Sequence, residues 1–331
     1  MVMVLLAGSV GCRRAVGAVV RRVFVIIFLA VAGVGCAAQP TPRPSDRPSG
    51  AQTPTGSTDS PAALVQAADG VLVPDVNVLR GQWTLFRAQQ LLVAQCMRDD
   101  GETYLITDPG PEPGTNTSTA ESLGTGTHLT YGLQASPLTS AQDAYVRQLS
   151  EPARTRYDQA LGGPANEQAS VTLPSGLVIS YREGGCLGQA RSRLFGSVQN
   201  AVLDSVLPQD VDKRFGKSLT QSARYKAALA DWRACMARAG YTYVDPTDAI
   251  NQIRLLLDGG TNPQHVGALE QAVADVDAVC DHPSRLRQVR AQELDAFLRG
   301  LPLPQLVSLA DVHRARLRAL DAVNRGSAVS Q

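Results

Sequence analysis

The sequence contains few of the side chains on which hydrolytic and metal chemistry most often depend. Only four histidines occur in 331 residues, at positions 128, 265, 282 and 313. No G-x-S-x-G turn, H-E-x-x-H helix, S-x-x-K motif or C-x-x-C pair is present. These patterns supply the nucleophiles, bases and zinc ligands of common enzyme families. The sequence therefore predicts no catalytic residue, no metal site and no cofactor.

The chain also lacks an excess of basic charge. It has 31 basic and 30 acidic side chains, a formal net charge of +1. Residues 1–35 hold four arginines and no acidic residue, so the remainder has 27 basic and 30 acidic side chains and a net charge of −3. Proteins that bind nucleic acid usually present a basic face. No nucleic-acid partner is expected.

The apolar run near the start is short. VFVIIFLAVAGV (23–34) has twelve residues, fewer than the roughly 20 that a transmembrane helix needs. Arg13, Arg14, Arg21 and Arg22 precede it, and a basic start before a short apolar core is typical of a signal peptide. Residues 1–35 are therefore predicted to be a signal peptide. The paired arginines also fit the twin-arginine route, although the strongly apolar core favours the general secretory route.

Cys36 follows the apolar run directly, in AGVGCAAQP. This stretch resembles a bacterial lipobox, in which the cysteine becomes the lipidated first residue of the mature chain, although Gly33 stands where leucine is usual. The alternative is an ordinary signal peptide cleaved near Ala37 or Ala38. The lipobox predicts a protein outside the cytoplasm that is anchored to the cell membrane by lipid on Cys36.

Proline, serine and threonine dominate the segment after this cysteine. AAQPTPRPSDRPSGAQTPTGSTDSP offers almost nothing that could be buried, so burial cannot offset the entropy lost on ordering it. We expect residues 36–66 to comprise the lipidated cysteine and a disordered tether. Residues 67–331 are then the folded domain, and they are numerous enough for one large core or two small ones.

One nine-residue motif occurs twice. CMRDDGETY (96–104) returns as CMARAGYTY (235–243), with five identical positions that define the pattern C-M-x3-G-x-T-Y. Apolar residues at spacings of three and four precede both copies, which predicts a helix before each. Glycine adopts the left-handed conformation that ends many helices, so Gly101 and Gly240 are predicted helix stops.

Four cysteines lie beyond the leader, which itself holds Cys12 and Cys36. Two disulfides are the usual state of four cysteines in an exported chain, and three pairings exist. We favour Cys96 with Cys186 and Cys235 with Cys280, because each motif is followed by one later cysteine. A zinc site that uses His282, two residues after Cys280, is the alternative.

The helical and strand patterns predict a mainly α fold. One β-hairpin is expected where VTL and LVISY flank PSG (174–176), and a single helix is expected from Cys186 to about residue 207. Further helices are predicted after the caps Ser150 and Asn262. The repeat suggests two related, disulfide-bridged halves, about 80–207 and 219–325, that arose by tandem duplication.

The repeated motif, together with YVRQLSEPARTRYDQALGG and GGCLGQARSRLFG, resembles a family of actinobacterial lipoproteins to which no activity is assigned. The resemblance covers roughly residues 85–285. It implies an architecture and a location but no active site.

We therefore expect a binding or structural module at the cell envelope, with the membrane and an envelope protein or polymer as partners. Its predicted contact segment is the Gly/Thr/Pro-rich loop 108–138, in which His128 and Tyr131 are the candidate binding residues. The alternative is an envelope hydrolase or metal-dependent enzyme whose site forms only in three dimensions. A solute-binding protein of a transporter is disfavoured, because it needs alternating strands and helices.

Overall fold

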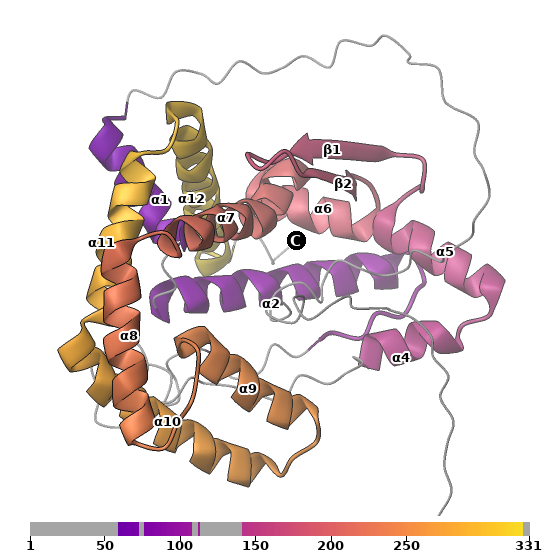
Figure 1. Cartoon of the computed structure of the whole chain (residues 1–331). Coiled ribbons are helices and arrows are strands. Elements are labelled where there is room, and N and C mark those ends of the chain that lie inside the picture. Colours follow the sequence, from indigo (N-terminus) through magenta and orange to yellow (C-terminus); the bar gives the residue numbers. More distant parts are fainter. Residues whose placement is uncertain (1–58, 73–75, 108–111, 113–140, 327–331) are drawn as a thin grey trace, which may run out of the picture. The chain divides into compact units, whose positions relative to one another are not determined.

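The computed structural model describes residues 59–72, 76–107, 112 and 141–326. Within them the chain is mainly helical, with one two-stranded sheet (Figure 1). The helices are α1 (Pro61–Leu72), α2 (Val76–Asp99), α4 (Ala141–Gln148), α5 (Glu151–Gly162), α6 (Gly185–Phe195), α7 (Val198–Leu219), α8 (Ala223–Arg238), α9 (Pro246–Asp258), α10 (Pro263–Ser284), α11 (Leu286–Arg299) and α12 (Leu303–Asn324). The strands are β1 (Gln168–Thr172) and β2 (Val178–Arg182).

Apolar side chains of the described residues gather into three clusters. The first is built mainly from α1, α7, α11 and α12 and includes Leu64 and Phe215. The second draws chiefly on α2, α5 and α6 and includes Met97. The third is formed mainly by α8, α9 and α10, around Trp232 and Met236. The helices that carry the two motif copies, α2 and α8, thus contribute to different parts of the core.

Disulfides join each motif helix to a later helix. Cys96 of α2 is bonded to Cys186 of α6, and Cys235 of α8 is bonded to Cys280 of α10. This is the pairing that the sequence analysis favours. The two bridges close loops of 90 and 45 residues. By the chain-entropy model each contributes about 4 kcal/mol to stability.

Both motif helices end in the same hydrogen-bonding pattern. Gly101 and Gly240 have φ of 77° and 90°, in the left-handed region. The residue after each glycine donates its N–H to the carbonyl of Met97 or Met236, at 2.8 and 3.0 Å, and the glycine N–H closes a shorter turn at 3.0 Å in both copies. This pair of hydrogen bonds is the Schellman motif, which satisfies the last carbonyls of a helix. The predicted helix stops are confirmed.

The predicted hairpin and caps also form. β1 pairs antiparallel with β2 from Gln168↔Arg182 to Thr172↔Val178, so the turn spans PSG. Ser150 precedes α5, which has proline in its first turn, although the serine hydroxyl makes no capping bond. Asn262 accepts hydrogen bonds from two backbone N–H groups at the start of α10.

The helix predicted from Cys186 to about residue 207 is in fact two helices. Gly196 adopts a φ of 80° after α6, and the hydroxyl of Ser197 accepts the N–H three residues further on to begin α7. α7 then continues through Pro208 to Leu219, beyond the predicted end of the first half. The αL glycine and the serine cap together account for the break, since one ends a helix and the other starts one.

α1 begins at Pro61, inside the segment 36–66 that the sequence analysis assigns to the tether. Leu64, Val65, Ala68 and Val71 lie on one helical face and are buried in the first cluster. The four residues recur at spacings of one, three and three, which is the signature of an amphipathic helix. Burial of this apolar face therefore stabilises a helix that begins at Pro61, although the residues before it are polar.

α12 is expected in the second half but packs mainly against α1, α2, α6 and α7. A Cβ at Gly81 of α2 would lie 3.0 Å from Leu320, so that glycine permits a close approach of the two helices. Arg316 of α12 also donates to the carboxylate of Asp204 in α7 at 2.8 Å, and both side chains are largely buried. Burial raises the pKa of Asp204, and the charge of Arg316 opposes that rise.

No single helix in the described ranges is long and apolar enough to cross a membrane; α1 and α2 pass that test only as a bent pair, by length and composition.

We predict that Gly101→Ala and Gly240→Ala each lower the free energy of unfolding by about 1–2 kcal/mol, because an L-residue is strained in the left-handed region. Gly216→Ala is the matched control. Gly216 lies inside α7 with open space around its Cα and no positive φ, so alanine there should stabilise the helix by up to about 1 kcal/mol. Urea unfolding of all three variants measures the difference, and equal effects at the three glycines would refute the assigned role.

Candidate functional site

The sequence-predicted site residues divide into two groups. Cys36, His128 and Tyr131 lie outside the described residues, so their roles stay predictions. The four remaining cysteines form the two disulfides. Each bridge joins one half-buried cysteine, Cys96 or Cys235, to a fully buried one. The bridges therefore reach the surface through the cysteine of the repeated motif.

A depression of about 380 Å³ lies over the second disulfide. Its walls come from the end of α8 and the middle of α10: Cys235, Arg238, Ala239, Asp275, Val276, Val279 and Cys280. Val279 is 69% exposed, which is unusual for a valine beside a buried core. The surface offers alkyl groups and disulfide sulfur, with one arginine and one aspartate at its edge.

A smaller depression, of about 150 Å³, lies over the first disulfide. It is lined by Leu92, Gln95, Cys96, Asp99, Cys186, Gln189, Ala190 and Arg193. A carboxylate oxygen of Asp100 lies 3.6 Å from Cys186 Sγ, and the amide oxygen of Gln189 lies 3.8 Å from Cys96 Sγ. The first disulfide is therefore flanked by oxygen atoms, one of which carries charge.

These contacts also answer the question of a metal site. Among the described residues, the one group of three potential ligands that converge is Cys96, Asp100 and Cys186. Metal binding by cysteine requires thiolates, and the two sulfurs are joined to each other. The zinc alternative at Cys280 fails for the same reason, since Cys280 is bonded to Cys235 and His282 is exposed beside it.

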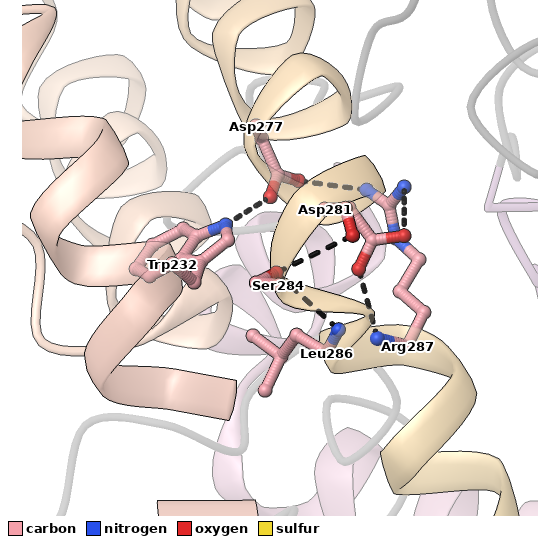
Figure 2. Close-up of polar contacts among 6 residues, drawn as sticks. All are labelled: Trp232, Asp277, Asp281, Ser284, Leu286 and Arg287. Atoms are coloured by element: carbon pink, nitrogen blue, oxygen red, sulfur yellow. Dashed lines mark hydrogen bonds and ion pairs between the residues drawn. The ribbon is translucent and has the colours of Figure 1, made fainter. Parts of the chain in front are cut away.

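A polar network lies one helical turn from the second disulfide (Figure 2). The indole N–H of Trp232 donates to Asp277 Oδ1 at 2.8 Å, and Arg287 Nη2 donates to Asp277 Oδ2 at 2.8 Å. Both Trp232 and Asp277 are almost completely buried. Burying a carboxylate is costly unless its oxygens are paired, and here each oxygen has a donor.

The network continues into the junction between α10 and α11. The backbone N–H of Arg287 donates to Asp281 Oδ1 at 2.8 Å, and its guanidinium lies 3.7 Å from the other carboxylate oxygen. Ser284 accepts from the N–H of buried Leu286 at 3.3 Å. Arg285, between the helices, has a φ of 53°. Such a residue costs about 1–2 kcal/mol, and the surrounding bonds offset that strain.

The sequence analysis did not identify this network. A signal exists in hindsight, because Trp232 precedes Cys235 by three residues and Asp277 precedes Cys280 by three. One helical turn therefore carries both the bridging cysteine and the hydrogen-bonding residue. The first disulfide has no such companion pair, since Val93 and Glu183 occupy the matching positions.

The described histidines take no part in either depression. His265 and His282 are exposed, whereas His313 is half-buried with its ring against Gly70 of α1. Burial, together with the charges of Arg316 and Arg314, lowers the pKa of His313. The three side chains are thus surface or packing residues of helices.

No protein-family model matches the chain, and no curated protein or solved structure is significantly similar to it.

We predict that the Trp232–Asp277 hydrogen bond couples α8 to α10 energetically. Trp232→Phe leaves one oxygen of a buried carboxylate without its donor and should lower the free energy of unfolding by about 1–3 kcal/mol. A double-mutant cycle with Asp277→Ala separates the hydrogen bond from the loss of ring packing. A coupling energy of about 1 kcal/mol or more is expected, and additive effects would contradict the coupling.

Proposed function

We propose that the protein is an exported lipoprotein that is held to the cell membrane by lipid on Cys36, and that its helical domain serves as a binding or structural module in the envelope. The proposal combines the basic and apolar leader, the cysteine that follows it and the polar tether. A tether of this composition would hold the domain away from the membrane surface.

The observation that carries the proposal is the pair of intrachain disulfides. All four cysteines beyond the leader are bonded, in two bridges. Disulfides form and persist in oxidising compartments and are rare in the cytosol. The bridges are thus consistent with an extracytoplasmic location, which is the location that a lipoprotein leader would give.

We also propose that the two motif copies mark related halves. Each copy combines a helix, a cysteine near its end, a Schellman turn and a disulfide to a later helix. Duplication of one such unit explains the shared features. In this view α1 and α12 are additions to the repeated units, and α12 packs on the first unit through α2 and α6.

The surface chemistry supports binding in preference to catalysis. The larger depression presents Val276, Val279 and disulfide sulfur, which make van der Waals contacts but do not transfer protons. The predicted contact segment 108–138 contains His128 and Tyr131, the candidate binding residues. An envelope hydrolase or metal-dependent enzyme stays the alternative.

We predict that Cys36→Ala releases the protein from the membrane into the medium, because stable anchoring needs more than one acyl chain and the variant would carry none. Cys12→Ala is the matched control, since Cys12 is the other leader cysteine and lies before the apolar run. That variant should stay anchored. Fractionation of expressing cells measures both, and a Cys36→Ala protein that remains in the membrane would exclude the lipoprotein assignment.

We predict that deletion of residues 113–128 abolishes retention of an envelope partner while stability and both disulfides are preserved. The deletion spares Glu112, whose carboxylate pairs with Arg80 of α2 at 3.0 Å. Capture from detergent-solubilised envelope, followed by mass spectrometry, compares the variant with the intact chain. Undiminished capture would contradict a role for this segment in binding, as would turnover of an envelope substrate that is lost on changing His128.

A further inference from the structure

The two disulfides share one architecture but differ in their immediate surroundings. The depression over each bridge is edged by one arginine and one aspartate, so these charges balance in both places. The first bridge has in addition the carboxylate of Asp100, 3.6 Å from Cys186 Sγ. In the second motif copy the position of Asp100 is occupied by Ala239.

The amide contact is also missing from the second copy. Gln189 lies three residues after Cys186 and places its oxygen 3.8 Å from Cys96 Sγ, whereas Pro283 lies three residues after Cys280. Among the described residues, no hydrogen-bonding oxygen contacts the sulfurs of Cys235 or Cys280. Two substitutions thus remove both oxygen neighbours from the second bridge.

These oxygens matter because thiol–disulfide exchange is a reaction of anions. A thiolate attacks one sulfur, and the other sulfur leaves with the electron pair of the broken bond. The carboxylate of Asp100 repels an incoming thiolate and disfavours negative charge on Cys186 Sγ. Ala239, at the matching position of the second copy, carries no charge and has neither effect. Exchange at the second bridge should therefore be faster.

The exposure of the two cysteines determines which sulfur an incoming thiolate attacks. Both cysteines line the larger depression, but Cys235 is half-buried whereas Cys280 is completely buried. A small thiolate in the depression reaches Cys235 Sγ first. The exposed guanidinium of Arg238, in the last turn of α8, lines that surface together with Asp275, so the depression presents no net charge to an incoming thiolate.

We propose that Cys235–Cys280 is a thiol-exchange site for small thiols and dithiols, and that Asp100 makes Cys96–Cys186 a protected structural bridge. In the exchange, a thiolate forms a bond to Cys235 Sγ, the S–S bond breaks, and Cys280 Sγ receives the electron pair and then a proton. With a dithiol, the second thiolate attacks the mixed disulfide. The products are two protein thiols and one oxidised dithiol, so two electrons and two protons pass to the protein.

The polar network next to this bridge favours re-formation of the disulfide. Trp232 and Asp277 join α8 to α10 by a hydrogen bond one turn away from the two cysteines, and we expect this bond to persist after reduction. After reduction the thiols therefore remain close, which favours re-formation of the same bond on oxidation. This inference rests on the disulfides and their neighbours and is independent of the lipid anchor.

The test is the order in which the two bridges of the purified, oxidised chain are reduced. Samples in dithiothreitol are quenched with an alkylating reagent over time, and peptide mapping gives the rate for each cysteine pair. We expect Cys235 and Cys280 to become alkylated about tenfold faster than Cys96 and Cys186. This is the order of magnitude expected for one charge near a reacting sulfur at a partly solvated site. Equal rates, or faster reduction of Cys96–Cys186, would overturn the proposal.

Reciprocal variants test the cause. Asp100→Asn keeps the side-chain shape, removes the charge and should speed reduction of the first bridge, whereas Ala239→Asp should slow reduction of the second. Glu102→Gln is the matched control, since Glu102 lies two residues after Asp100 but its carboxylate faces Arg156, at 4.0 Å. It should change neither rate appreciably. If neither reciprocal variant changes the reduction rate of its disulfide, the electrostatic explanation is wrong.

Two further readouts separate exchange in the folded state from reduction after unfolding. The rate at Cys235 should rise in proportion to thiol concentration while far-UV circular dichroism is unchanged; a rate independent of thiol would show that opening comes first and would overturn the proposal. Asp100→Asn should also speed reaction of the first bridge with anionic 2-mercaptoethanesulfonate more than with cationic cysteamine. An equal gain for both thiols would contradict charge repulsion.

Discussion

The covalent bond between the end of a motif helix and the buried face of a later helix is the constraint on which the described fold depends. In both copies the cysteine lies in the last turns of its helix, five residues before the glycine stop. Its partner is completely buried. The Schellman turn then fixes where the chain leaves, because its hydrogen bonds fix the last turn and the exit of the following residue. Helix end, disulfide and chain direction are thus set together.

Beyond this shared frame, the two copies stabilise their surroundings differently. The first copy surrounds its exit segment with polar contacts: the phenol of Tyr104 donates to Gln90 at 3.0 Å, and the backbone N–H of Leu105 donates to Gln142 at 2.6 Å. In the second, the backbone N–H of Val244 likewise donates to Asp248, at 2.9 Å, but Tyr241 also stacks on Tyr243, with ring centroids 5.9 Å apart. The same motif therefore tolerates two kinds of packing, since its own hydrogen bonds are made by the backbone.

The sequence predicts the local features of this fold well and the distant ones poorly. Gly101, the hairpin around PSG and the cap at Asn262 act through bonds a few residues away, so their types and spacings suffice. The disulfide pairing also follows, because four cysteines leave few choices. The packing of α12, the bond from Trp232 to Asp277 and the cluster around α1 join residues far apart in the chain. Their partners are chosen by shape and burial, which a periodic pattern does not contain.

The same reasoning explains why the proposed difference between the two bridges is visible only in three dimensions. In the sequence, Asp100 and Ala239 are variable positions inside a shared motif and look like solvated surface. The fold brings the first of them next to a sulfur that is 86 residues away. Because the backbone holds the motif together, side chains at such positions are free to differ without loss of the helix end. In the proposed assignment, a repeated motif therefore keeps two bridges of the same architecture while the neighbouring charges give them different chemistry.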